Sequence, residues 1–138
     1  MKGSLTIVGL GPGAPELVTP AVTDALKDST DIVGYSKYID RVKDASGKSF
    51  HPSDNREEID RAALSINLAL KGKKVVVVSS GDPGVFAMAS AIFEVVDKKN
   101  ISIDDLSIVV LPGITALLAA SARLGAPIGH DFCVINLS

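Results

Sequence analysis

The sequence predicts an α/β fold, an αβα sandwich in which helices cover both faces of a mostly parallel, five-stranded sheet. Three observations lead to this prediction. Strand and helix patterns alternate along the chain, as they do in repeated βα units. Four consecutive valines, residues 75–78, are typical of a strand buried on both faces of a parallel sheet. Turns rich in glycine and proline follow several of the predicted strands.

Short apolar runs bounded by turn residues predict the strands. The first run leads directly into the sequence Gly-Leu-Gly-Pro-Gly, which ends that strand abruptly because these residues favour a turn. The predicted strands lie at residues 5–8, 31–34, 49–51, 75–78, 106–111 and 132–137.

Capping residues and the spacing of apolar positions predict the helices. Thr19 and Pro20 begin the first, because threonine caps a helix and proline fits its first position. Ser53 or Asp54 caps the next helix, which Gly72 ends. The predicted helices begin at residue 20 and cover residues 59–70, 85–98 and 114–124, and residues 35–43 form a loop or a short helix.

Composition excludes several classes of protein. The 138 residues suffice for one domain, and 46% hydrophobic with 22% charged residues argues against disorder. A net charge of −2 provides no basic surface for nucleic acid or an anionic membrane. The single cysteine, Cys133, cannot form an internal disulfide, and no residue cluster predicts a metal site. No segment has the length of a membrane span or the form of a signal peptide, so we expect a cytoplasmic protein.

Three loops rich in glycine and proline are predicted to form a ligand site. They lie at residues 9–13, 79–84 and 112–115, each directly after a predicted strand. In parallel sheets ligands bind beyond the carboxyl ends of the strands, so the three loops converge where a ligand is expected. Each loop residue also has a simpler interpretation: Asp82 equally suits a turn or a helix cap, and Thr115 suits a helix cap. A binding domain with purely structural loops therefore stays an alternative.

A dinucleotide-binding oxidoreductase domain is a remote alternative. Gly9 and Gly11 match the Rossmann glycine pattern superficially. Pro12 and Pro15 remove backbone donors from the turn that would bind a pyrophosphate, and no acidic residue for a ribose follows the second strand at Gly34. A phosphate-binding Walker loop is excluded because no Gly-Lys-Ser or Gly-Lys-Thr sequence follows a glycine-rich loop.

Five segments in order resemble the tetrapyrrole methylases, which are S-adenosylmethionine-dependent enzymes of corrinoid and sirohaem biosynthesis and relatives of diphthine synthase. Within that family the chain is most similar to the branch that methylates precorrin-3B, or its cobalt form, at C-17 with ring contraction in cobalamin biosynthesis. Other tetrapyrrole methylase specificities and diphthine synthase stay as alternatives. The segments are GLGPG (9–13), YSKYIDR (35–41), SSGDPGVFAMA (79–89), PGITALLAA (112–120) and LGAPIGHDFC (124–133).

The resemblance implies a two-domain enzyme with its active site in the cleft between two α/β domains. Residues 1–128 would be the N-terminal domain, and residues 129–138 a linker strand toward a C-terminal domain that this chain lacks. The chain alone is therefore expected to be inactive. The implied cofactor is S-adenosylmethionine, with S-adenosylhomocysteine as its product. The implied partners are a tetrapyrrole substrate, the missing domain and a second copy in a homodimer.

The resemblance also implies site residues. Basic and tyrosine side chains would face the substrate's carboxylates. No catalytic base is assigned, because Ser36 stands where some relatives of the sirohaem branch have an acid. The implied cofactor contacts are Pro12, Ser80, Gly81, Asp82, Val85, Thr115 and Ala116. The implied substrate contacts are Gly11, Gly13, Tyr35, Lys37, Tyr38 and Arg41.

Overall fold

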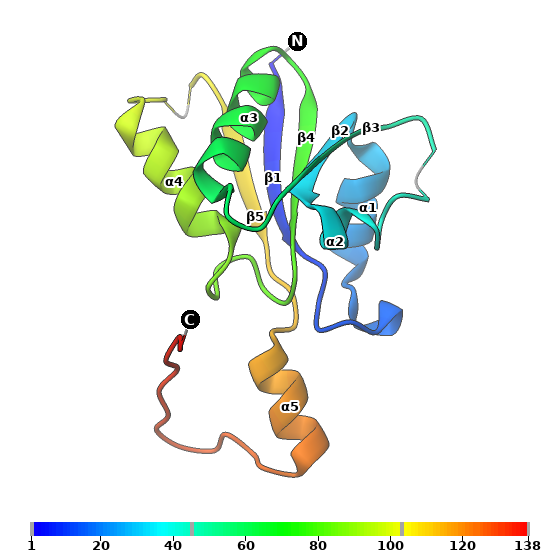
Figure 1. The fold of residues 1–138 in the computed structure, drawn as a ribbon, viewed down its shortest axis with the longest axis vertical. Helices are drawn as coiled ribbons and strands as arrows, with labels where there is room; N and C mark the ends of the chain where they lie inside the picture. The colour runs from blue at the N-terminus through cyan, green and yellow to red at the C-terminus, as the bar shows by residue number, and fades with distance from the viewer. Residues whose placement is uncertain (1, 45, 103, 138) are drawn as a thin grey trace.

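A computed structural model describes residues 2–44, 46–102 and 104–137 and confirms the predicted α/β fold. Five strands form one sheet in the order β3-β2-β4-β1-β5 (Figure 1). Every strand pair in it is parallel, whereas the sequence predicted a mostly parallel sheet. The strands are β1 (Ser4–Gly9), β2 (Asp31–Tyr35), β3 (Ser49–Ser53), β4 (Lys74–Ser79) and β5 (Ser107–Leu111). The helices are the 3₁₀ turn η1 (Pro15–Leu17), α1 (Pro20–Asp28), α2 (Ser36–Ile39), α3 (Glu58–Leu70), α4 (Met88–Lys98) and α5 (Ala116–Leu124).

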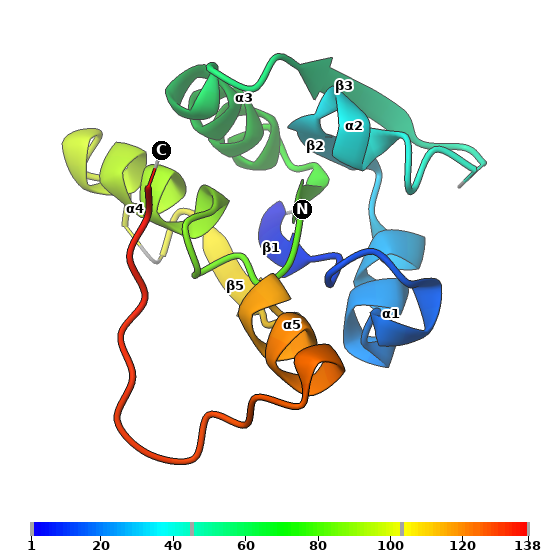
Figure 2. The same ribbon diagram turned by 60° about the horizontal axis from the view of Figure 1, so that its bottom comes forward.

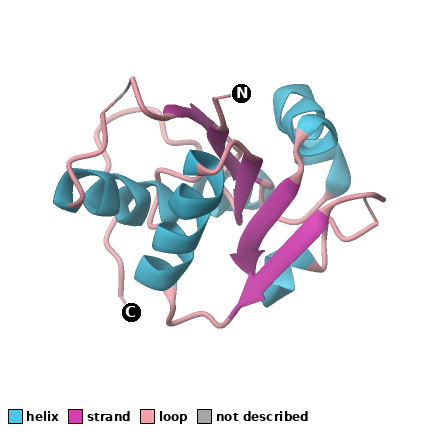
Figure 3. Cartoon of the chain, turned by 90° about the horizontal axis from the view of Figure 1, so that it is seen from above, coloured by secondary structure: helices cyan, strands magenta, loops and turns pink. Residues whose placement is uncertain are grey.

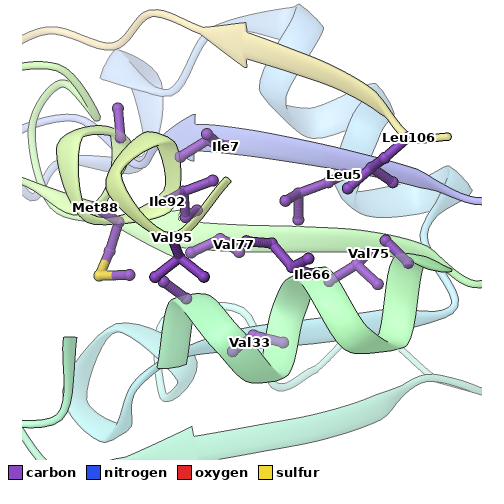
Figure 4. Close-up of a cluster of buried hydrophobic side chains, with 13 residues drawn as sticks. Leu5, Ile7, Val33, Ile66, Val75, Val77, Met88, Ile92, Val95 and Leu106 are labelled. Atoms are coloured by element: carbon purple, nitrogen blue, oxygen red, sulfur yellow. The ribbon is translucent and has the colours of Figure 1, made fainter. Parts of the chain in front are cut away.

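Helices cover both faces of the sheet, as Figure 3 shows from above. Helices α3 and α4 bury one face, where Ile66 and Ile92 pack against Leu5 and Val77 (Figure 4). Helices α1 and α2 bury the opposite face, where Val22 packs against the alternate side chains of β1 and β4. Each fully buried aliphatic side chain contributes roughly 1.5–3 kcal/mol to burial. The aliphatic strands therefore hold the two helical layers together without large aromatic residues.

Two helix boundaries follow the sequence prediction closely. Thr19 is the N-cap of α1, and its Oγ1 accepts a hydrogen bond from the Val22 N–H at 3.3 Å, while Pro20 occupies the first position. Helix α3 ends before Gly72, whose φ of +86° lies in the left-handed region that favours glycine. These boundaries depend only on local residue chemistry.

Three predicted helix starts are wrong by one or more residues. Helix α3 begins at Glu58, because β3 continues to Ser53 and Asp54 enters a turn that the Glu57 carboxylate closes through the Asp54 N–H. Helix α4 begins at Met88 rather than at residue 85, because Phe86 has a φ of +49° that no α-helix includes. Helix α5 begins at Ala116 rather than at residue 114.

The strand predicted at residues 132–137 is not formed. Residues 131–137 have no regular secondary structure and are exposed. A strand requires a neighbouring backbone to accept its hydrogen bonds, and this segment pairs with no strand in the described residues. It lies with α5 beyond the carboxyl edge of the sheet (Figure 1), and none of the α5 residues is buried. The division into residues 1–128 and 129–138 stays a prediction.

None of the helices within the described ranges combines the length and the apolar character that crossing a membrane would require.

Asp31 is a buried carboxylate at the start of β2. Its Oδ1 lies 2.8 Å from the Nε2 of His51 on β3, and its Oδ2 accepts a hydrogen bond from the Thr30 hydroxyl at 2.7 Å. Burial by itself would raise the pKa of Asp31. The hydrogen bonds from His51 and Thr30, together with the charge of Lys73, outweigh this effect and hold the pKa below its ordinary value.

We expect this carboxylate to make stability fall in acid. A lowered pKa stabilises the folded chain fully above the unfolded aspartate pKa of about 3.9, and the contribution is lost as pH falls through the lower folded value. Asp31→Asn should cost about 1–2 kcal/mol at neutral pH and reduce the acid dependence, as urea unfolding between neutral pH and pH values below the pKa can measure. Asp24→Asn, at an exposed position on α1, is the control. An unchanged acid dependence in Asp31→Asn would contradict the assignment.

Candidate functional site

The three predicted loops meet at the carboxyl edge of the sheet, which faces the reader in Figure 2. The loops follow β1, β4 and β5, which are neighbours in the order β4-β1-β5. Helix α1 follows β1 on one face, and α4 follows β4 on the other. Adjacent parallel strands whose following helices diverge in this way leave a crevice at their carboxyl ends, where ligands bind in open α/β sheets. The fold therefore places the loops where the sequence predicted them.

Glycine backbones join the three loops at what we call the glycine junction, formed by Gly9, Gly11, Gly81 and Gly113. The Gly11 N–H donates to the Gly81 carbonyl at 3.1 Å, and the Gly81 N–H donates to the Gly11 carbonyl at 2.9 Å. The φ angles of Gly11 and Gly81 are +69° and +60°, a region that disfavours other residues. A Cβ on Gly9 or Gly113 would lie 2.2 Å or 2.3 Å from the Gly81 carbonyl oxygen. Only glycine lets these loops approach so closely.

Asp82 connects the second loop to the third. Its Oδ1 accepts a hydrogen bond from the Gly113 N–H at 2.9 Å. Its Oδ2 accepts another from the Gly84 N–H, also at 2.9 Å, and so closes the turn of its own loop. This geometry matches the turn-fixing role that the sequence left open for Asp82. A carboxylate has lone pairs for further donors, so the ligand contact stays a prediction beside that role.

A pocket of about 490 Å³ opens beside the glycine junction. Its volume lies within the usual range of small-molecule sites. Loops after β2, β4 and β5 contribute to it, which brings together side chains that are far apart in the sequence. The residues predicted from the sequence that line it are Tyr35, Tyr38, Ser80, Gly81, Asp82, Val85, Thr115 and Ala116.

Two of these residues form an aromatic pair. The rings of Tyr35 and Tyr38 meet edge to face, with their centroids 5.2 Å apart and an interplanar angle of 89°. Thr115 is the N-cap residue of α5, as predicted, but its side chain makes no capping hydrogen bond. The first backbone N–H groups of a helix have no acceptor within the helix, so the start of α5 presents donors beside Thr115 and Ala116.

The other predicted contacts lie outside this pocket. Gly13 and Arg41 line a separate depression of about 420 Å³, and neither Pro12 nor Lys37 lines the main pocket. Arg41 donates hydrogen bonds to the carbonyls of Leu10 at 2.6 Å and Gly11 at 3.5 Å, so its guanidinium holds the first loop. The structure thus gives Arg41 a structural role that the sequence did not predict. Ligand contacts of these residues stay predictions.

Sequence reasoning missed Arg61, a buried cation that lines the pocket. Its Nε donates to the Ser53 hydroxyl at 2.8 Å, a terminal nitrogen donates to the Asp54 carbonyl, and Nη1 lies 3.4 Å from the Met88 sulfur. Burial lowers the pKa of Arg61, and the charge of Glu58 opposes that effect. The sequence contained one signal: Arg61 precedes the buried Ser65 and Ala69 at intervals of four on the inward face of α3. Other pocket residues missed are Asn55, Glu58, Ser79, Phe86, Ala87, Met88, Leu117 and those at 134–137.

We expect Gly113→Ala to disrupt the glycine junction. The added Cβ has no space beside the Gly81 carbonyl, so the loop must move and the substitution should cost about 1–3 kcal/mol of stability. Gly129→Ala is the matched control, because a Cβ at that position would meet no described atom within 4 Å. Urea unfolding of both variants measures the difference. Equal stabilities would show that the junction tolerates a side chain.

Comparisons with known proteins agree with this geometry. A precorrin-3B C(17)-methyltransferase from Sinorhizobium sp is 46% identical over all of this chain and 54% of its own length. The crystal structure of the methyltransferase CobJ superposes with a TM-score of 0.93 at 57% identity, covering 99% of this chain and 56% of that one. A uroporphyrin-III C-methyltransferase from Thermus thermophilus, solved in complex with S-adenosylhomocysteine, has a TM-score of 0.72 at 26% identity over 94% of this chain and 54% of its own.

The chain spans about half the length of these relatives. The family profile of the tetrapyrrole (corrin/porphyrin) methylases matches residues 4–138. Because that match covers nearly the whole sequence, the chain belongs to the tetrapyrrole methylase family.

Proposed function

We propose that this chain is the N-terminal, cofactor-binding part of an S-adenosylmethionine-dependent methyltransferase that acts on C-17 of precorrin-3B, or its cobalt form, in cobalamin biosynthesis. The observation that carries the proposal is the convergence of predicted cofactor contacts on one pocket. Ser80, Asp82 and Val85 from the loop after β4 line it together with Thr115 and Ala116 at the start of α5. The names of the Sinorhizobium relative and of CobJ support the substrate class.

The chemistry proposed for this pocket depends mainly on positioning. A sulfonium methyl group is already activated, so the enzyme must align it with a ring carbon of the substrate. Alignment of bound reactants can supply on the order of 7–11 kcal/mol of a barrier. The loop after β4 is held on two sides, by the Gly11–Gly81 hydrogen bonds and by Asp82, and it therefore suits a role in fixing the cofactor. The paired rings of Tyr35 and Tyr38 suit one wall for a flat apolar macrocycle.

A second domain is part of the proposal. Apolar side chains are exposed along β5, α5 and the segment after it, including Val109, Leu118, Leu124, Phe132 and Ile135. Exposed apolar surface of this extent is typical of an interaction site. We expect the further part of the longer relatives to cover it and to complete the active-site cleft. The chain alone should then lack methyltransferase activity. From the resemblance we further expect the complete enzyme to be a cytoplasmic homodimer.

Calorimetric titration tests the cofactor. We expect the longest natural chain that contains this sequence to bind S-adenosylhomocysteine, and the 138-residue segment to bind it weakly or not at all, because half of the cleft is missing. NAD is the control ligand and should not bind. Binding of NAD without S-adenosylhomocysteine would replace the proposal by the dinucleotide-binding alternative. Masses of the products formed from several tetrapyrroles then distinguish this specificity from those of other methylases.

Asp82→Asn tests the loop that holds the cofactor. The amide keeps one acceptor oxygen, so one of the two hydrogen bonds to Gly84 and Gly113 is lost and the loop loosens. In the longer chain we expect the affinity for S-adenosylhomocysteine to fall about tenfold, the equivalent of one hydrogen bond to a charged group. Asp97→Asn, at an exposed position on α4 outside the pocket, is the matched control. Unchanged affinity in Asp82→Asn would favour a binding domain with purely structural loops.

A further inference from the structure

Among the residues that the structure describes, Arg61 is a buried positive charge without a paired carboxylate. Its side chain lies on α3 and is 4% exposed. No carboxylate oxygen of the described residues lies within 4.0 Å of its nitrogens. Arginine is rarely buried unless it is paired, because removing a charge from water is costly. The missing counter-charge is therefore the feature that requires an explanation.

Neutral groups orient the guanidinium from three sides. The Ser53 hydroxyl at the end of β3 accepts from Nε at 2.8 Å, and the Asp54 carbonyl accepts from a terminal nitrogen. The Met88 sulfur at the start of α4 lies 3.4 Å from Nη1 and is a weak acceptor. A guanidinium has five N–H donors, so these contacts hold it in place without using all of them. The fork is held in position but incompletely satisfied.

The nearest carboxylates do not neutralise Arg61. Asp54, Glu57 and Glu58 are all exposed, so water screens their charges. Asp54 Oδ1 accepts from the Asn55 N–H at 2.6 Å, and Glu57 Oε2 accepts from the Asp54 N–H at 3.0 Å, so both carboxylates bind the turn that leads into α3. Although burial lowers the pKa of Arg61, a guanidinium remains protonated at neutral pH.

The pocket is where a negative charge can reach Arg61. Arg61 lines it beside Tyr35, Tyr38 and Met88, and the cofactor contacts expected at Ser80 to Val85 come from another loop. We propose that Arg61 is the anion-binding residue of this pocket and holds a carboxylate of a bound ligand. The planar guanidinium matches a carboxylate through paired hydrogen bonds. The inference rests on the proposed function, which supplies two sources of that group: the acidic side chains of a tetrapyrrole and the amino-acid part of S-adenosylmethionine.

The test compares ligands with and without the carboxylate. Arg61→Gln removes the charge, and Arg61→Lys keeps the charge but loses the planar fork. Arg56→Gln is the matched control, because Arg56 is an exposed residue of the same connection and does not line the pocket. The variants are made in the longest natural chain, and thermal unfolding verifies their folding. Calorimetry uses S-adenosylhomocysteine against 5′-methylthioadenosine, which lacks the amino-acid part, and uroporphyrin III against coproporphyrin III, which has methyl groups in place of the acetates.

Two results support the proposal and identify the source. If Arg61 holds a substrate carboxylate, Arg61→Gln should lower the affinity for uroporphyrin III about tenfold and leave that for S-adenosylhomocysteine unchanged. If it holds the cofactor's carboxylate, the affinity for S-adenosylhomocysteine should fall about tenfold and that for methylthioadenosine should not change. In either case Arg61→Lys should lose less, and added salt should reduce the difference from the unmodified chain.

Other results overturn it. Unchanged affinities in Arg61→Gln, or equal losses for ligands with and without the carboxylate, would mean that Arg61 only holds the turn between β3 and α3. The unmodified chain separates this failure from failure of the proposed function. If that chain binds S-adenosylhomocysteine while Arg61→Gln gives either of those two results, the function stands and the inference fails. If the unmodified chain binds neither S-adenosylhomocysteine nor uroporphyrin III, both fail.

Discussion

The backbone contact between Gly11 and Gly81 determines how the carboxyl edge of the sheet is built. Two hydrogen bonds join the loops after β1 and β4 at the point where their following helices diverge to opposite faces. Gly113 from the loop after β5 packs against the same Gly81 carbonyl, with no space for a Cβ. Three loops thus share one contact made only of backbone. A side chain at any of these positions would separate the loops and change the pocket beside them.

The two charged residues at the pocket differ in how they are satisfied. Both carboxylate oxygens of Asp82 accept backbone N–H groups, so its charge is used within the protein. Within the described part of the chain, Arg61 has only neutral acceptors, and it lies buried at the wall formed by α3 and the start of α4. Electrostatic complementarity then favours an anionic group near Arg61. A pocket with a rigid loop and a buried cation that awaits an anion suits a methyl transfer that depends on holding its reactants in place.

The strand order and the site agree with the sequence where patterns are local. The valines of β4, the Thr19 cap and the three glycine-rich loops follow from residue chemistry alone. The predictions fail where contacts between distant segments decide. Phe86 has a positive φ that delays α4, and residues 131–137 have no strand to pair with among the described residues. Arg61 was missed for the same reason, because its sequence neighbours do not reveal that Ser53 and Met88 surround it.

Local sequence is sufficient for the α/β class, for most of the element positions and for the edge of the sheet at which a ligand is expected. Periodicity and turn chemistry act over a few residues, and the chain direction of a parallel sheet places all the loops after strands at one edge. Only the tertiary structure decided that Arg41 holds the first loop, that Asp82 joins two loops, and that Arg61 lies buried among neutral acceptors. These are contacts between residues distant in sequence, and their geometry exists only once the sheet and its two helical layers have packed.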